Sequence, residues 1–259
     1  MKRIQLFGLR LPLIHEGDSL TDLILKKGEN NPEISLRDHD ILVIASKAVS
    51  ASQGRIIHLS SINPSKRALE LAPECGLEPA FIELAIQQAD EILGVVPGAI
   101  LTLSKGFVQA NAGVDRSNTI PGTAILLPKS PEASAKKMRK EIYEKTGLRV
   151  AVIIGDSRTT PLRRGTSGVA LGISGMFPVI DDRGKTDLFG NQMRITWRAV
   201  ADNCCCAAQL LMGESDEQIP VVVIRGLSID FSGSKEMMIS PDLCLYFGAL
   251  FGAANQEHY

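Results

Sequence analysis

A polar segment, residues 106–118, holds the first group of side chains that could do chemistry. Residues 107–110 predict a short strand, which runs into a turn of small and polar residues. The turn carries a carboxylate, a cation, a hydroxyl and an amide: Asp115, Arg116, Ser117 and Asn118. Taken alone, a run of Asn, Gly, Asp and Ser is typical of an ordinary polar turn, so this segment does not by itself indicate a site.

A second carboxylate follows a buried strand. Residues 150–155 form a continuous apolar run of the kind that is covered on both faces of a sheet. Asp156 comes at the carboxyl end of this run, and the basic, flexible segment Arg163-Arg164-Gly165 follows a few residues later. Because two aspartates now end strands in polar turns, we expect one shared site in which Arg163 and Arg164 contact anionic groups.

The side chains at the ends of these elements suit a hard cation. Carboxylate and hydroxyl oxygens bind Mg²⁺ or Mn²⁺, usually together with a phosphate, and the candidates are Asp115, Asp156, Ser157 and Glu214. Neither GxxxxGK[ST] nor GxGxxG occurs in the sequence. A nucleotide site would therefore be neither of the P-loop nor of the Rossmann type.

Composition limits the class of protein. The chain has 259 residues, 44% of them hydrophobic, which is enough for a packed core. Lysine and arginine number 28 against 29 acidic residues, and only 5% of residues are aromatic, so a nucleic-acid partner is not expected. Arg10 interrupts the apolar amino-terminal stretch, and residues 243–254 are too short to span a bilayer and predict a buried helix. We expect a cytoplasmic protein without a membrane partner.

Cysteine and histidine do not indicate a soft-metal site. Three of the five cysteines are consecutive, Cys204 to Cys206, and neighbours on a helix point about 100° apart, so they cannot close on one ion. We expect them to pack as small apolar side chains in a helix. The four histidines show no HxxH or HExxH spacing.

The elements that must position these side chains alternate without a regular βαβ repeat, which predicts an α+β fold of mixed sheets and packed helices. The proline-containing stretch 128–131 suggests two lobes, residues 1–128 and 129–259. Asp181 and Asp182 predict a solvated turn. We expect helices over 19–27, 64–71, 81–92, 130–147 and 196–212, and strands over 4–14, 41–45, 100–104, 107–110, 124–127, 150–155 and 220–226.

The order of short motifs along the chain is similar to that of a known family, the coenzyme F-420:L-glutamate ligase family (coenzyme F-420-0 gamma-glutamyl ligase). The resemblance runs from about Leu11 to Gly226 with the spacing kept. It rests on residues 11–14 with 16–18, Ser46-Lys47 with Val49-Ser50, residues 111–118, Asp156, Arg163-Arg164-Gly165, residues 172–175 and 187–190, Met212-Gly213-Glu214 and residues 223–226.

The resemblance implies an activity. Members add L-glutamate to the lactyl-phosphate carboxylate of a deazaflavin coenzyme precursor through an acyl phosphate, using GTP and Mg²⁺ or Mn²⁺, with K⁺ as an optional further ion. They are homodimers with an α+β fold peculiar to the family. By resemblance, Asp115 and Asp156 bind one metal, and Ser157 and Glu214 serve a second. The nucleotide-lining positions that it implies are Leu11, Pro12, Leu13, Ile14, Ser46, Lys47, Asn118, Met212 and Gly213.

Two departures from the family pattern leave the acceptor open. Ala51 stands where lysine is common, and residues 157–162 lack the usual glycine and terminal aromatic residue. A related amide ligase acting on another carboxylate is therefore one alternative. Another is a serine hydrolase with a Gly155-Asp156-Ser157 signature, for which His258 would be the late base, and a third is a nucleotide-binding relative without catalysis.

Overall fold

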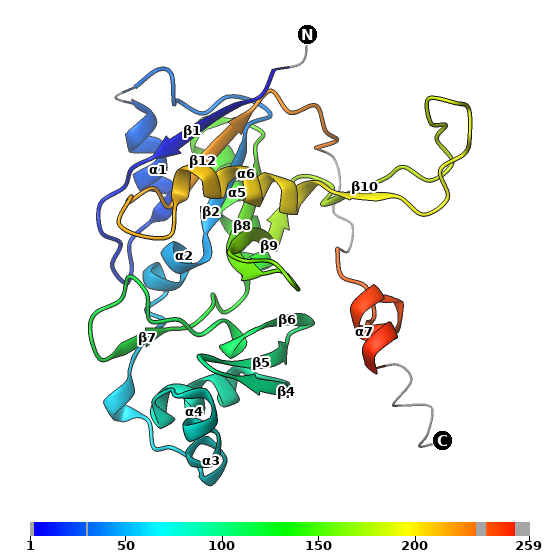
Figure 1. Cartoon of the computed structure of the whole chain (residues 1–259). Coiled ribbons are helices and arrows are strands. Elements are labelled where there is room, and N and C mark those ends of the chain that lie inside the picture. The colour runs from blue at the N-terminus through cyan, green and yellow to red at the C-terminus, as the bar shows by residue number, and fades with distance from the viewer. Residues whose placement is uncertain (1–2, 30, 232–236, 252–259) are drawn as a thin grey trace.

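A five-stranded sheet in the order β1-β12-β2-β8-β9 forms the centre of the larger part of the chain (Figure 1). The structure is a computed structural model that describes residues 3–29, 31–231 and 237–251. Strands β2 and β8 are parallel and the other neighbours are antiparallel, so the sheet is mixed and the predicted α+β class is confirmed. The strands are β1 (Gln5–Leu9), β12 (Val221–Arg225), β2 (Ile41–Ala45), β8 (Ala151–Thr159) and β9 (Thr166–Ser174).

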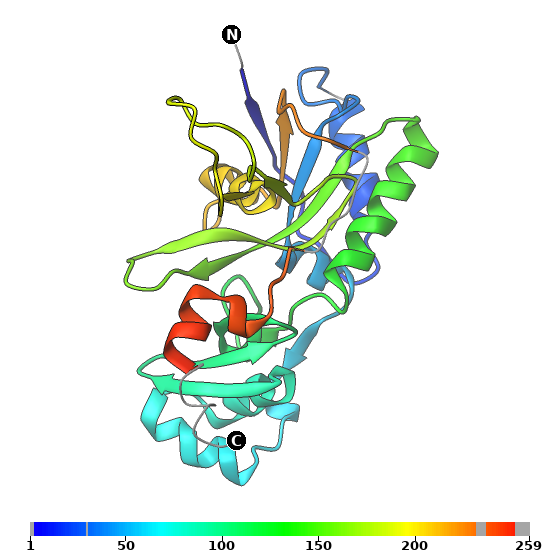
Figure 2. The same ribbon diagram turned by 90° about the vertical axis from the view of Figure 1, so that its right-hand side faces the viewer.

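Helices cover both faces of this sheet (Figure 2). Helices α1 (Leu20–Glu29) and α5 (Pro131–Thr146) lie on one face, and α6 (Val200–Met212) lies on the other. Successive side chains of a strand point to opposite faces, so every residue of β2 from Ile41 to Ile44 is buried in one of two apolar clusters. Strand β2 is therefore a continuous apolar run, as its sequence predicts.

Two glycines of β9 let helices approach the sheet closely. A Cβ atom on Gly168 would lie 2.3 Å from the backbone carbon of Cys205 in α6. A Cβ atom on Gly172 would lie 2.3 Å from backbone atoms of Pro131 and Glu132 at the start of α5. No larger residue fits at either position without moving a helix. On α6, Cys204 and Cys205 are buried, which confirms for these two that they pack as apolar side chains, whereas Cys206 is exposed, so the prediction was wrong for it.

Residues 56–126 form a smaller part with its own apolar cluster. It contains a three-stranded antiparallel sheet, β4-β5-β6, and a two-stranded pair, β3-β7. Strands from both sides of residue 128 share the central sheet, so the lobe boundary predicted there is not a boundary of that sheet. The elements are β3 (Ile56–His58), α3 (Lys66–Cys75), α4 (Pro79–Gln88), β4 (Glu91–Val96), β5 (Ala99–Ser104), β6 (Phe107–Ala110) and β7 (Thr123–Ile125).

Local capping chemistry explains which helix limits were predicted correctly. Ser130 accepts a hydrogen bond from Ala133 N at the start of α5, and Gly147 adopts a left-handed conformation at its end. The helix predicted over 81–92 was wrong at its carboxyl end. Helix α4 stops at Gln88, and Glu91 begins β4, because the β4 residues pair with β5 instead of continuing the helical face.

Two other expectations were wrong. The strand predicted over 4–14 ends at Leu9. The turn predicted to be solvated at Asp181 and Asp182 is not, because Asp182 is only 7% exposed and forms ion pairs with Lys185 and Arg198 (2.5 Å). It lies beside the short strands β10 (Val179–Asp181) and β11 (Trp197–Ala199).

The carboxyl-terminal apolar run also differs from its prediction. It forms a short helix, α7 (Leu245–Phe251), whose Leu245 is 77% exposed, so the helix is not buried. Residues 252–254 of that run and His258 lie outside the described residues. None of the described helices is both long and apolar enough to span a bilayer.

Candidate active site

Two parallel strands bring the first candidate residues to one edge of the central sheet. Ala45 of β2 pairs with Gly155 of β8, so Ser46 and Asp156 leave the pairing side by side. One local expectation was wrong here. The strand predicted over 150–155 does not end there, because β8 continues past Gly155 after an irregularity in its pairing with β9. Helix α2 (Ser46–Ser52) begins directly after β2.

Asp115 comes to the same place from the smaller part of the chain. It follows the 3₁₀ turn η2 (Asn111–Gly113) and is held by a backbone bridge to Ile125. Lys47 Nζ lies 2.6 Å from Asp115 Oδ2 and also donates a hydrogen bond to Ser117 Oγ. Ser117 in turn donates from Oγ (2.7 Å) and from its backbone N (2.9 Å) to Asp115. The structure therefore joins Lys47 to the predicted carboxylate turn.

Arg116, from the same turn, belongs to the packing and not to this cluster. Its Nη1 lies 3.3 Å from Glu78 Oε2, and its guanidinium stacks 4.5 Å from the ring centre of Phe81. A cation over an aromatic face is stabilised by the ring quadrupole. Arg116 thus fixes the turn to α4 and directs its charge away from Asp115.

The two aspartates have opposite pKa shifts. Burial raises the pKa of Asp156 to about 6, although hydrogen bonds from Ser157 and Ser46 and the charge of Lys47 act to lower it, and the charge of Asp115 adds to the increase. Burial also acts to raise the pKa of Asp115, but hydrogen bonds from Lys47 and Ser117 outweigh it, so that pKa lies below its ordinary value. Asp115 is therefore held in its ionised form, whereas a bound cation would stabilise the ionised form of Asp156.

The raised pKa of Asp156 predicts a pH dependence of stability. The folded protein holds this proton up to about pH 6, whereas the unfolded chain loses it near pH 3.8. The contribution is therefore complete below pH 3.8 and is lost as the pH rises through about 6, and it amounts to at most about 3 kcal/mol. We expect the difference in unfolding free energy between parent and Asp156→Asn to change over pH 4–6, measured by urea denaturation in EDTA. A constant difference would contradict the raised pKa.

Glu214 and Ser157 meet at the end of α6. Ser157 Oγ lies 3.5 Å from Glu214 Oε2, and Thr166 Oγ1 donates to Glu214 Oε1 at 2.9 Å. Gln209 Nε2 donates to the same Oε1 atom. Sequence analysis grouped Ser157 with Glu214, and the structure places them together. Sequence analysis missed Thr166 and Gln209, because their residue types and spacing carry no distinctive signal.

Two of the segments proposed to line a nucleotide contact the turn after α6. Asn118 Nδ2 donates to the backbone oxygen of Ser215 at 2.7 Å, which joins the Asp115 turn to the Met212-Gly213 turn. Leu11 N donates to the backbone oxygen of Gln218 at 3.1 Å, which brings the segment from Leu11 to Ile14 to the other side of that turn. Leu11 is buried, whereas Leu13 is 79% exposed. Segments far apart in sequence thus surround one turn.

Arg163 and Arg164 lie in the connection between β8 and β9. Both side chains are exposed, and the connection contains two left-handed residues, Leu162 and Gly165. Neither arginine lines the cavity beside Asp156. Their predicted contact with an anion is not formed by any described protein group and stays a prediction.

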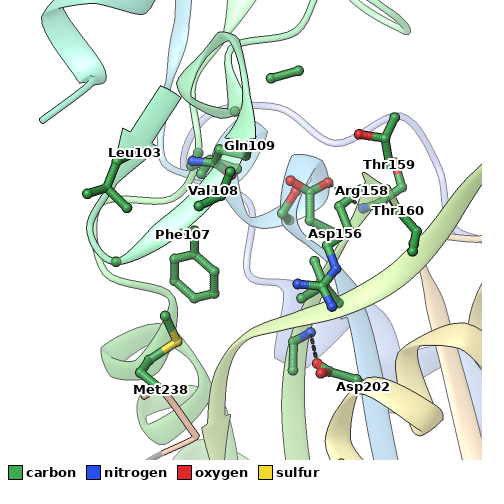
Figure 3. A pocket seen from close by; sticks show the side chains of 18 of the residues that line it. Leu103, Phe107, Val108, Gln109, Asp156, Arg158, Thr159, Thr160, Asp202 and Met238 are labelled. Atoms are coloured by element: carbon green, nitrogen blue, oxygen red, sulfur yellow. Dashed lines mark hydrogen bonds between the residues drawn. The ribbon is translucent and has the colours of Figure 1, made fainter. Parts of the chain in front are cut away.

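A cavity of about 880 Å³ opens beside Asp115 and Asp156 (Figure 3). Its walls come from the central sheet, from β5 and β6, and from the segment 237–247. Sequence analysis had not singled out three kinds of lining residue: Arg158 on β8, Gln109 on β6, and apolar side chains such as Met238 beyond residue 226. Their cavity positions follow from contacts between distant segments, which single-sequence patterns do not encode.

The oxygen donors beside this cavity fit a divalent cation that is shared with a ligand. Asp115 and Asp156 are close enough for the charge of one to raise the pKa of the other, and a cation between them would remove that cost. Within the described ranges, no group of three or more His, Cys, Asp or Glu side chains could hold an ion by itself. Mg²⁺ commonly uses one or two carboxylates plus substrate phosphates, so this donor set suits Mg²⁺ or Mn²⁺.

Comparison with known proteins identifies related chains. The family profile described as F420-0:Gamma-glutamyl ligase matches residues 8–226. A protein of Methanocaldococcus jannaschii named Coenzyme F420:L-glutamate ligase is 42% identical over 237 residues, covering 90% of this chain and 92% of its own. Proteins of the same name from Archaeoglobus fulgidus (40% identical; 90% and 92% covered) and Methanothermobacter thermautotrophicus (41%; 86% and 89%) are also similar.

Proposed function

The chain belongs to the F420-0:gamma-glutamyl ligase family, and on that premise we propose that it joins L-glutamate through an amide bond to the lactyl-phosphate carboxylate of a deazaflavin coenzyme precursor. The observation that carries the proposal is the meeting of Lys47, Asp115 and Asp156 beside one large cavity. This is the combination of cation, carboxylates and enclosed space that phosphoryl transfer needs. GTP as the phosphoryl donor and Mg²⁺ or Mn²⁺ as the metal belong to the same proposal.

The reaction follows from the chemistry of its substrates. A carboxylate does not condense with an amine in water unless it is first activated. Transfer of the GTP γ-phosphoryl group to the acceptor carboxylate forms an acyl phosphate, and the glutamate amine then attacks the acyl carbon and displaces phosphate. A divalent metal, when bound, would neutralise part of the phosphate charge.

The protein groups have separate tasks in this proposal. Asp115 and Asp156 hold one metal, Ser157 and Glu214 serve a second, and Lys47 neutralises a phosphate oxygen. Arg163 and Arg164 contact anionic groups when ligands are bound. The nucleotide is held by Leu11 to Ile14, Ser46, Asn118, Met212 and Gly213. The hydrogen bonds from Leu11 and Asn118 to the turn after α6 support this grouping. A homodimer, an optional K⁺ and a cytoplasmic location complete the proposal.

The decisive experiment is mass spectrometry of the acceptor. The purified protein is incubated with the deazaflavin lactyl-phosphate acceptor, glutamate, Mn²⁺ and GTP. We expect the acceptor to gain one or more glutamyl units, with no gain when GTP or Mn²⁺ is omitted. A gain on another carboxylate from a cell extract, and none on the deazaflavin, would keep the mechanism and reject the acceptor.

The same incubation tests the serine-hydrolase alternative. Ser157 Oγ has Glu214 as its side-chain neighbour in the described structure, at 3.5 Å, whereas a serine nucleophile needs a positioned base. Ester hydrolysis that Ser157→Ala abolishes, with no glutamylated product from the parent, would replace the ligase proposal with the hydrolase. Nucleotide binding without any product would favour the non-catalytic relative.

A further inference from the structure

The cavity beside Asp156 has two cationic residues in its walls as far as the structure describes them, Lys47 and Arg158. Lys47 is already paired, with its Nζ 2.6 Å from Asp115 Oδ2. Arg158 is exposed, and its guanidinium forms no hydrogen bond or ion pair with any described residue, Asp156 included. Arg158 therefore has hydrogen-bond donors that no described protein group occupies, in a cavity whose walls also carry Asp115, Asp156 and Asp202.

The backbone directs Arg158 into the cavity. It lies two residues after Asp156 on β8, and side chains at i and i+2 of a strand share a face. Its backbone partner is Ser167 of β9, so the neighbouring strand holds its position. Figure 3 shows the guanidinium in the cavity beside Asp156. A guanidinium offers paired N–H donors that match a phosphate or carboxylate.

A second unpaired donor lines the same cavity from the other sheet. Gln109 lies on β6, and its Nε2 is buried without a hydrogen-bond partner among the described residues. A buried amide nitrogen without a partner is costly, and such a group in a cavity wall points to a ligand that supplies the acceptor. Gln109 carries no charge, so a neutral carbonyl oxygen is the matching group.

Apolar side chains form part of the remaining wall, which also includes the carboxylates of Asp115, Asp156 and Asp202. Leu103 and Phe107 contribute from the β5-β6 hairpin, and Met238 contributes from beyond the family match, which ends at residue 226 (Figure 3). An aromatic ring and a flexible thioether suit a flat, polarisable ligand. The cavity thus combines apolar side chains, a neutral donor and a guanidinium.

We propose that Arg158 and Gln109 determine which acceptor this protein binds. Arg158 binds the anionic linker of the acceptor, and Gln109 donates a hydrogen bond to a carbonyl oxygen of its planar ring system, which lies against Phe107 and Met238. The inference rests on the proposed ligase function and concerns only the acceptor half of the site. One of the two residues, Arg158, lies in the 157–162 segment, where this sequence departs from the family pattern.

The test for Arg158 compares two ligands by isothermal titration calorimetry: the deazaflavin lactyl-phosphate acceptor and the deazaflavin nucleoside, which has the ring but no anionic linker. Arg158→Gln should weaken binding of the acceptor about tenfold and leave nucleoside binding unchanged, because only the acceptor loses a charge-assisted contact. Arg158→Lys should recover part of the loss. Arg67→Gln, on the exposed face of α3, is the matched control and should change neither affinity.

Gln109→Leu should weaken both ligands about tenfold, because both carry the ring. The same variant should melt at or above the parent temperature, since it removes a buried donor that lacks a partner. A purely structural role for Gln109 would instead lower the melting temperature. Gln192→Leu, at an exposed position outside the cavity lining, is the control for the change in polarity.

The outcomes separate this inference from the proposed function. A parent protein that glutamylates the deazaflavin, together with Arg158→Gln and Gln109→Leu variants that keep its acceptor affinity, overturns the inference and leaves the ligase intact. A rise in the KM for glutamate instead of the acceptor also overturns it, because Arg158 would then bind the amino acid. A parent that binds neither deazaflavin ligand overturns both.

Discussion

Replacing Asp156 with asparagine should lower GTP- and metal-dependent turnover by about a hundredfold or more, without destabilising the fold. Asparagine has the same size as aspartate but no charge. Burial already raises the pKa of Asp156 to about 6, so the folded protein holds a charge there only at a cost. Removing that charge removes the cost of burial and, in the proposed function, one ligand of the metal. Activity and stability should therefore change in opposite directions.

The measurement is phosphate release from GTP with acceptor and glutamate present, together with thermal melting of each variant. Excess Mn²⁺ should recover little of the activity. A higher metal concentration offsets weaker binding, but it does not replace the ligand that positions the metal. Asp22→Asn is the matched control, since Asp22 pairs with Lys145 at the surface, far along the chain from the site. An Asp156→Asn variant that keeps parental turnover at limiting Mn²⁺ would remove Asp156 from the metal site.

The apolar strands explain why the position of Asp156 at a strand end could be predicted. Residues 41–44 and 150–154 are continuous apolar runs, and such runs predict buried strands whose ends carry the polar residues. The structure pairs these two strands in parallel, so Ser46 and Asp156 emerge at one edge. Which strands become neighbours depends on long-range packing, and the local pattern of a single sequence does not contain that information.

Strand β9 shows where local patterns fail. Its residues 166–174 are rich in glycine and small side chains, and sequence analysis predicts no strand there. Gly168 and Gly172 are small because α6 and α5 pack against the strand at backbone contact. The tertiary environment selects against the side chains that normally indicate a strand. Because β9 was not predicted, β8 was predicted to end too early. Sequence analysis therefore did not place Arg158 on a strand.

The composition of the cavity could not be predicted for a related reason. Gln109, Arg158 and Met238 come from three segments that are separated by many residues, and none belongs to a motif. The motif residues Lys47, Asp115 and Glu214 are recognisable because phosphate and metal chemistry restricts their types. An acceptor pocket has no such restriction, since many apolar and polar combinations can bind a planar molecule.

Replacing Lys47 with methionine should lower kcat/KM for GTP by about a hundredfold, the second of the two largest effects that we expect. Methionine keeps the apolar stem and removes the ammonium group. That group lies 2.6 Å from Asp115 Oδ2 and hydrogen bonds to Ser117 Oγ, so its loss leaves Asp115 without a counter-charge as well as removing a phosphate contact. Lys137→Met on the exposed face of α5 tests the same change where the lysine has only a surface pair.

Lys47→Arg distinguishes a phosphate contact from an ion pair that only holds Asp115 in place. Arginine keeps the charge and can still pair with Asp115, so it should restore the melting temperature if Lys47→Met lowers it. It cannot place a compact ammonium at the same point, because its guanidinium is planar and longer. If Lys47 contacts phosphate, kcat/KM for GTP should stay low in Lys47→Arg although the fold is restored. Full recovery of activity in that variant would show that the lysine serves only to position Asp115.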